Sequence, residues 1–137
     1  MINRLTDALN FNAQALTLRA ERQRIIASNI ANADTPGYVA RDLNFAQALR
    51  DATSNAAITG ASELRSSDLN GSATSARVAR NLVYATPSQT SLDNNTVHMD
   101  RERAAFAENA IKYESTLRFV NGQVKTMMDA MKGNNAA

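Results

Sequence analysis

The length and composition of the chain favour one modest domain and exclude several classes of function. The chain has 137 residues, a formal charge of +2 from 15 basic and 13 acidic residues, and neither cysteine nor tryptophan. The absence of cysteine excludes disulfides and thiol chemistry. Hydrophobic residues make up 44% of the chain but aromatic residues only 5%, so the apolar content relies on alanine, which buries little surface. We therefore expect a small core that depends on packing partners.

The distribution of charge argues against nucleic-acid and membrane binding. The densest basic run is Arg19, Arg22 and Arg24, with Glu21 among them, which predicts a solvated helix face rather than a phosphate-binding stripe. No stretch approaches the roughly 20 apolar residues of a membrane span, and the N-terminus lacks the apolar block of a secretory signal. We expect no nucleic-acid partner, no direct membrane insertion and, if the protein is exported, no cleaved signal peptide.

Residues 1–35 are predicted to form the N-terminal helix of a coiled-coil-like core, over residues 2–33. Apolar and small residues recur there at alternating steps of four and three, as on one seam of a helix. The alanines and Gln23 make this seam thin, which favours close helix–helix approach. Pro36 and Gly37 then predict a stop and a tight type II turn. The residues of this seam are Leu9, Ala13, Leu16, Ala20, Gln23, Ala27 and Ile30.

Residues 36–99 are predicted to contain the turn, a flexible linker and a small irregular or β region. Residues 50–76 are small and polar without aromatics, a composition typical of a linker. Leu82–Tyr84 is short and β-prone and predicts a small hairpin or an edge strand.

Residues 100–137 carry the strongest helical pattern of the chain. Asp100 is a candidate N-cap, and a helix over residues 100–131 would be about 48 Å long at about 1.5 Å per residue. Such a helix cannot bury its whole stripe in a small monomer, so we expect it to pair with the N-terminal helix and with helices of other chains. The predicted fold is mainly α, with two long terminal helices. The apolar heptad positions are Phe106, Ala110, Tyr113, Leu117, Val120, Val124, Met127 and Met131.

No pattern in the sequence predicts a catalytic, cofactor-binding or metal site. His98 is the only histidine and is interpreted as a surface or cap-adjacent residue, because no second ligand accompanies it. Glu102 and Glu108 lie six residues apart on the last helix and are interpreted as solvated charges. We therefore expect a structural assembly subunit rather than an enzyme.

Several segments resemble the flagellar rod and hook proteins of bacteria. Ser28–Tyr38 resembles the signature A-N-I-A-N-x-x-T-P-G-Y of that family, and residues 39–45 and Ser91–Asp100 resemble the members at the proximal end of the rod. Two residues depart from the pattern: Asn94 replaces a glycine, and His98 replaces an aspartate. Asn94 tolerates a left-handed backbone, so we expect the turn to survive. The signature residues are Asn29, Asn32, Thr35, Pro36, Gly37 and Tyr38.

The resemblance implies a structural subunit of the proximal rod, the drive shaft that crosses the periplasm around the export channel. The implied partners are the chain itself, other rod proteins, the rod-adaptor protein FliE, the MS-ring protein and the flagellar type III export apparatus. Phe45 and Leu49 match the family's short export-gate motif, although local packing against the first helix explains their spacing equally well. The alternatives are another rod protein of the family and, from a different class, a small helical DNA-binding or regulatory protein.

Overall fold

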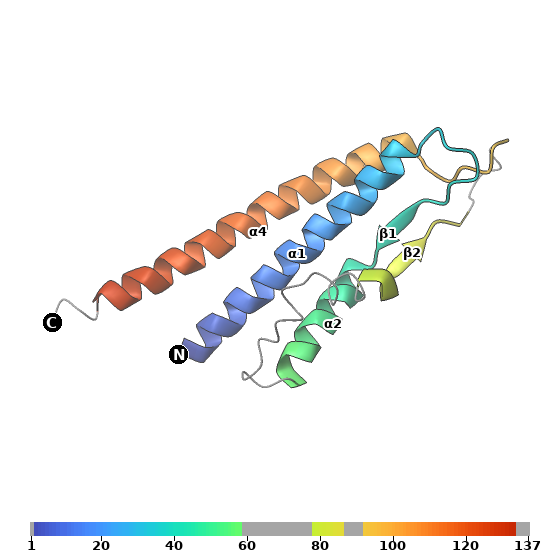
Figure 1. Cartoon of the computed structure of the whole chain (residues 1–137). Coiled ribbons are helices and arrows are strands. Elements are labelled where there is room, and N and C mark those ends of the chain that lie inside the picture. The colour runs from blue at the N-terminus through green and yellow to red at the C-terminus, as the bar shows by residue number, and fades with distance from the viewer. Residues whose placement is uncertain (1, 59–77, 87–91, 134–137) are drawn as a thin grey trace.

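The computed structural model describes residues 2–58, 78–86 and 92–133. Two long helices, α1 (Ile2–Ala31) and α4 (Met99–Gly133), run antiparallel side by side, so that the start of α1 and the end of α4 lie at the same end of the molecule (Figure 1). At about 1.5 Å per residue they measure about 45 and 52 Å. The predicted mainly α fold with two long terminal helices is confirmed. None of the described helices is both long enough and apolar enough to cross a membrane.

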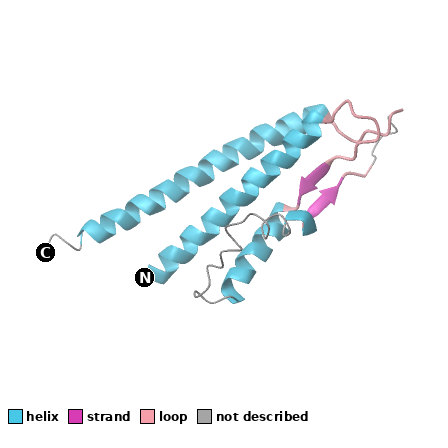
Figure 2. Ribbon diagram, viewed as in Figure 1, coloured by secondary structure: helices cyan, strands magenta, loops and turns pink. Residues whose placement is uncertain are grey.

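A smaller layer packs against α1. It contains strand β1 (Arg41–Leu43), helix α2 (Phe45–Ile58) and strand β2 (Leu82–Tyr84) (Figure 2). The strands pair antiparallel, with Asp42 opposite Val83. The strand predicted at Leu82–Tyr84 is confirmed, and its partner is the strand that precedes α2.

The linker predicted over residues 50–76 is wrong for residues 50–58, which belong to α2. Small side chains have a structural use in α2: Ala48 and Ala52, four residues apart, are 2% and 4% exposed. Alanine also has the highest helix propensity, so the same composition supports a helix once one face is buried. Residues 59–76 lie outside the described part of the chain.

The hydrophobic core lies between α1 and this smaller layer. Phe45, Leu49, Ile25 and Leu82 pack against its edge, which confirms the local packing expected for Phe45 and Leu49. Because this core covers one side of α1 and α4 covers another, α1 is the central element of the fold (Figure 1). The buried members of the core are Leu18, Leu43, Ala48, Ala52 and Val78.

The ends of the long helices are defined by local hydrogen bonds. After α1, the amide of Tyr38 donates to the carbonyl of Thr35 at 3.3 Å, and Gly37 has a φ of +73°, as a type II turn requires. At α4, the amide of Glu102 donates to the carbonyl of His98 at 3.0 Å. His98 is therefore the N-cap residue. The expectation for Asp100 is wrong, because Asp100 lies in the first turn, where its charge favours the helix dipole.

Candidate assembly site

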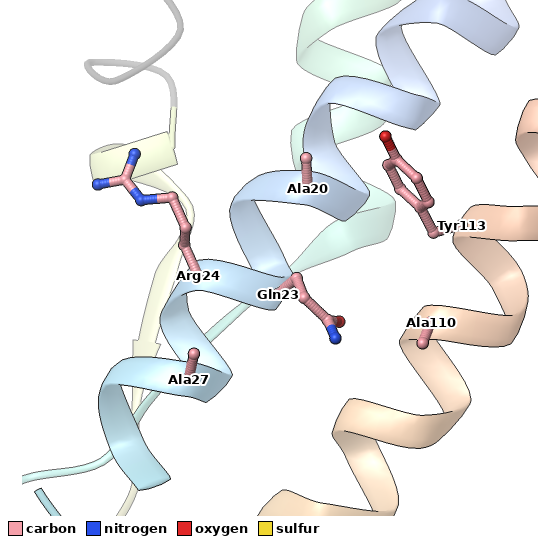
Figure 3. A pocket seen from close by; sticks show the side chains of 6 residues that line it. All are labelled: Ala20, Gln23, Arg24, Ala27, Ala110 and Tyr113. Atoms are coloured by element: carbon pink, nitrogen blue, oxygen red, sulfur yellow. The ribbon is translucent and has the colours of Figure 1, made fainter. Parts of the chain in front are cut away.

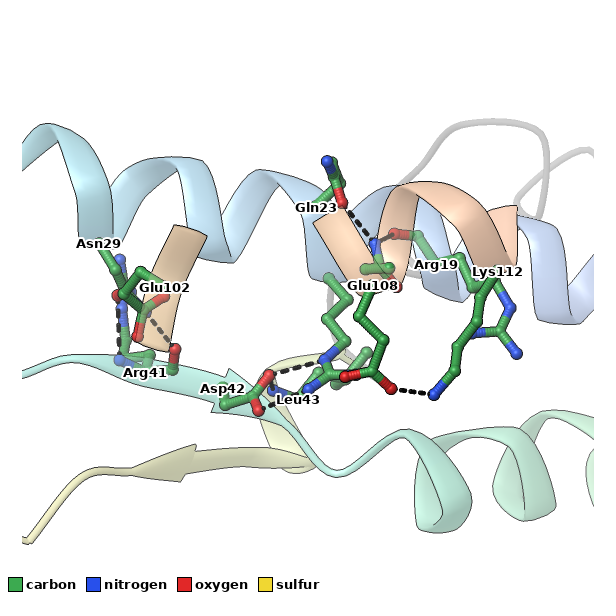
Figure 4. Close-up of polar contacts among 11 residues, drawn as sticks. Arg19, Gln23, Asn29, Arg41, Asp42, Leu43, Glu102, Glu108 and Lys112 are labelled. Carbon is green, nitrogen blue, oxygen red and sulfur yellow. Dashed lines mark hydrogen bonds and ion pairs between the residues drawn. The ribbon is translucent and has the colours of Figure 1, made fainter. Parts of the chain in front are cut away.

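The corner where α1 ends and α4 begins is held by a buried asparagine. Asn29 is 1% exposed. Its Nδ2 donates to the carbonyl of Arg41 at 2.6 Å and to Oε2 of Glu102 at 3.1 Å (Figure 4). Its Oδ1 accepts from the amide of Arg41 at 3.1 Å and from the hydroxyl of Tyr38 at 3.3 Å. One side chain thus joins α1, the signature turn, β1 and the start of α4.

Two further asparagines bind the carbonyl groups at the end of α1. Asn32 donates through Nδ2 to the carbonyl of Ser28 at 2.8 Å and accepts from the hydroxyl of Thr35 at 3.2 Å. Nδ2 of Asn95 lies 2.8 to 3.0 Å from the carbonyl oxygens of Asn32, Ala33 and Thr35. These contacts hold the end of α1 and the turn that follows it, and Asn95 ties that turn to the segment before α4.

The segment before α4 completes the corner. The amide of Gly37 donates to the carbonyl of Asp93 at 2.7 Å, and the amide of Thr96 donates to the carbonyl of Tyr38 at 3.0 Å. Asn94 has a φ of 56°, so it adopts the expected left-handed backbone. Ser28–Tyr38 and residues 92–100, which belong to two of the three runs that resemble the rod family, therefore form one structural unit. The roles of Asn95 and Thr96 were not predicted, although both belong to the second of these runs.

Two arginines of α1 are not the solvated residues that we predicted. Arg22 forms a bidentate ion pair with Asp42 of β1, with both N–O distances 2.9 Å; this hydrogen bond raises the pKa of Arg22. Arg19 stacks 4.5 Å from the ring centroid of Phe45, and burial lowers its pKa. Both face the smaller layer or α4, so packing determines their positions. Arg24 remains largely exposed.

The two glutamates predicted as solvated have different surroundings. Glu108 is exposed and pairs with Lys112 (Figure 4), which lowers the pKa of the Glu108 carboxyl. Glu102 is partly buried and accepts from Asn29, so the prediction for Glu102 is wrong. No group of three metal-ligating side chains occurs within the described ranges.

The predicted assembly residues of α4 divide between two neighbouring rows. The middle row is half-buried against α1, apart from Phe106, which is 39% exposed. The outer row is exposed: Leu117 is 38%, Val124 39% and Met131 62% exposed. The face towards α1 is completed by polar residues that we had not predicted. The three rows are: polar row, Glu102, Asn109, Thr116 and Gln123; middle row, Phe106, Tyr113, Val120 and Met127; outer row, Ala110, Leu117, Val124 and Met131.

The predicted residues of α1 lie beside these rows. Leu9, Leu16 and Ile30 are half-buried. A hollow of about 380 Å³ between the helices is lined by alanines of both, with Tyr113 directed across it towards α1 (Figure 3). The small side chains leave room at this face for a side chain from outside the chain.

The sequence that forms this fold and corner matches a class of structural proteins. The family model described as "Flagella basal body rod protein" matches residues 9–38, which span most of α1 and the signature turn. The chain is also similar over nearly its whole length to individual rod proteins.

Three relatives illustrate this similarity. The flagellar basal body rod protein FlgB of Salmonella typhimurium is 47% identical over 98% of this chain and 100% of its own length. The FlgB proteins of Escherichia coli K12 and Yersinia enterocolitica are 46% and 44% identical over 98% and 96% of this chain, and over 100% and 98% of their own lengths. The chain therefore belongs to the FlgB family of flagellar basal body rod proteins and is a structural subunit of that rod.

Proposed function

We propose that the chain polymerises through α1 and α4 into the proximal rod, where these helices surround the export channel. The observation that carries this proposal is the outer row of α4. Leu117, Val124 and Met131 recur every seventh residue and are 38 to 62% exposed. Fully burying such a side chain is worth roughly 1.5–3 kcal/mol, so covering the row would stabilise a contact between subunits. An enzymatic activity has no place in this proposal.

The proposed partners follow from the same assembly. They are further copies of the chain, other rod proteins, the rod-adaptor protein FliE and the MS-ring protein. We place the subunit in the rod within the periplasmic space, delivered by the flagellar type III export apparatus without a cleaved signal. Support comes from the FlgB relatives, which are named as basal body rod proteins.

Phe45 and Leu49 are proposed as the element that the export gate recognises. In the folded chain both side chains pack against the core, and Arg19 stacks on the Phe45 ring. Recognition would therefore require an unfolded chain. Phe45→Ala should reduce export more than Leu43→Ala, which removes a side chain that is 3% exposed in the same core but lies outside the motif. Equal export of the two variants would contradict the role of the motif.

Leu117→Asp tests the assembly surface. The substitution places a charge in the outer row, where a neighbouring helix would bury it, at a cost of several kcal/mol. We expect swimming to be lost while expression and helical content stay normal. Ser115→Asp, on an exposed position of the same helix, is the matched control and should swim. Normal swimming of Leu117→Asp would contradict the proposal.

A further inference from the structure

The polar row of α4 forms a ladder of contacts with α1. Glu102 accepts from Nδ2 of Asn29 at 3.1 Å, and Gln123 accepts from Nδ2 of Asn12 at 3.1 Å. These two contacts lie near opposite ends of the interface. Because the four members of the row recur every seventh residue, each one returns to the α1 side of the helix.

The centre of the ladder is the most buried part. Asn109 is 0% exposed, and its Nδ2 donates to the carbonyl of Arg19 at 2.9 Å and to Oε1 of Gln23 at 2.6 Å. Thr116 is 9% exposed and accepts from Nε of Arg19 at 3.2 Å. Gln23, which interrupts the apolar seam of α1, is therefore the partner of Asn109 in the polar row of α4.

These polar residues are poorly explained by stability alone. A pair of hydrogen-bonded polar groups adds little over two apolar groups of similar shape, because both partners lose contact with water. Asn109 also carries a cost, since its Oδ1 is buried without a hydrogen-bond partner among the described residues. Meanwhile the apolar outer row of the same helix is left uncovered. The two buried residues of α4, Asn109 and Thr116, are thus polar, whereas its apolar residues are at most half-buried in the middle row and exposed in the outer row.

We infer that the polar row determines the register between α1 and α4. A slip of α4 by one helical turn would place Ala105 or Tyr113 opposite Gln23. The hydrogen bond between the side chains of Asn109 and Gln23 would then be broken. An apolar row would tolerate such a slip, because its contacts are not directional. A single buried asparagine specifies register in coiled coils by the same principle.

The fixed register has a consequence for assembly, and this step rests on the proposed function. The outer row of α4 and the alanines of α1 line one surface only if the two helices keep one alignment. The polar row would therefore determine the shape of the surface offered to neighbouring subunits without touching them.

The register is measurable in the full-length chain. The absence of cysteine allows spin labels to be placed at Asn10→Cys and Ser115→Cys, both exposed positions, and their separation to be measured by double electron–electron resonance. The labelled parent should give one narrow distance. Asn109→Leu combined with Gln23→Leu should keep the helical content and add a second population displaced by about 5 Å, the rise of one turn.

Controls separate a loss of register from a loss of folding. Asn121→Leu makes the same substitution at an exposed position of α4 and should leave one narrow distance. Circular dichroism reports folding: Gln23→Leu with Asn109→Leu should melt no earlier than the parent, and Thr116→Val provides a milder second variant that should broaden the distance. A single narrow distance in the Leu–Leu variant, or a broad one already in the parent, would overturn the inference.

A motility assay tests separately whether the register affects assembly. If the Leu–Leu variant shows two registers and swims poorly, both the inference and its consequence are supported. If it shows two registers but swims normally, the consequence for assembly is refuted while the register role stands. Failure of the proposed function would instead appear as normal swimming of Leu117→Asp, whose register is intact.

Discussion

The corner of the molecule buries polar side chains, whereas the outer face of α4 exposes apolar ones. At the corner, polar side chains are buried and hydrogen-bonded: Asn29 is 1% exposed, and its side chain takes part in four hydrogen bonds. Along α4, apolar side chains such as Met128 and Met131 are 49% and 62% exposed. The family signature thus shapes the chain itself, whereas under the proposed assembly the exposed apolar residues of α4 would face neighbouring subunits.

The largest effect on stability should come from breaking the corner. Asn29→Leu keeps the number and branching of the side-chain heavy atoms but leaves the backbone groups of Arg41 and the side chain of Glu102 without their partner. Each buried group left unsatisfied costs about 1–3 kcal/mol, so we expect the free energy of unfolding to fall by about 2–4 kcal/mol in urea denaturation. Asn121→Leu, at an exposed site, should change it by less than about 0.5 kcal/mol.

That measurement sharpens the comparison when it is paired with Leu117→Asp. The charge at Leu117 should remove assembly but leave the urea midpoint of the monomer close to that of the parent, because the side chain is 38% exposed. Asn29→Leu, in contrast, should lower the urea midpoint of the monomer. Equal destabilisation by both variants would show that the outer row supports the chain's own fold.

Replacing glycine by alanine is a test of intermediate size. The same substitution should change the free energy of unfolding in opposite directions in the two regions. Gly37 has a φ of +73°, and a Cβ added there would meet nothing within 4 Å, so Gly37→Ala should cost about 1–2 kcal/mol through backbone strain alone. Gly122 lies inside α4 with equally open space. Gly122→Ala should raise the free energy of unfolding by up to about 1 kcal/mol. The same sign for both substitutions would contradict the turn geometry or the helix.

The elements themselves were largely predictable from local patterns. The apolar heptads predicted α4, and Pro36 with Gly37 predicted the turn, because helix periodicity and positive φ are properties of neighbouring residues. The choice of which row of α4 faces α1 was not predictable in this way. It depends on the pairing of Asn109 with Gln23, 86 residues apart. Gln23 alone resembles a defect in an apolar seam, and Asn109 alone resembles a solvated residue beside one.

Helix α2 was missed for a related reason. Its alanine, serine and asparagine residues have the composition of a linker, and what makes them helical is burial against distant groups. Ala48 and Ala52 pack in one cluster with Leu43 and Val78, and Val78 lies 26 residues after Ala52 in the sequence. Likewise Arg22 gains its partner, Asp42, only when β1 folds back onto α1.

The smallest expected effect concerns pH and separates α2 from the corner. The pKa of the Asp51 carboxyl is lowered because it accepts hydrogen bonds from Asn81 at 3.1 Å and Gln47 at 2.8 Å. A carboxyl whose pKa is lower in the folded chain stabilises it fully above the unfolded value, here close to the ordinary 3.8, and loses that contribution as the pH falls through the folded value.

Acid should therefore loosen α2 before the corner, where the contacts come mainly from the neutral amides of Asn29, Asn32 and Asn95. Hydrogen exchange of the Ala48 and Ala52 amides, measured from pH 5 down to pH 3, should show protection falling earlier than at Gly37 and Thr96 once intrinsic exchange rates are corrected. Asp51→Asn removes the titrating group and should flatten the response of α2. An unchanged response would mean that another carboxyl controls α2, whereas simultaneous loss in both regions would mean that the corner and α2 unfold as one unit.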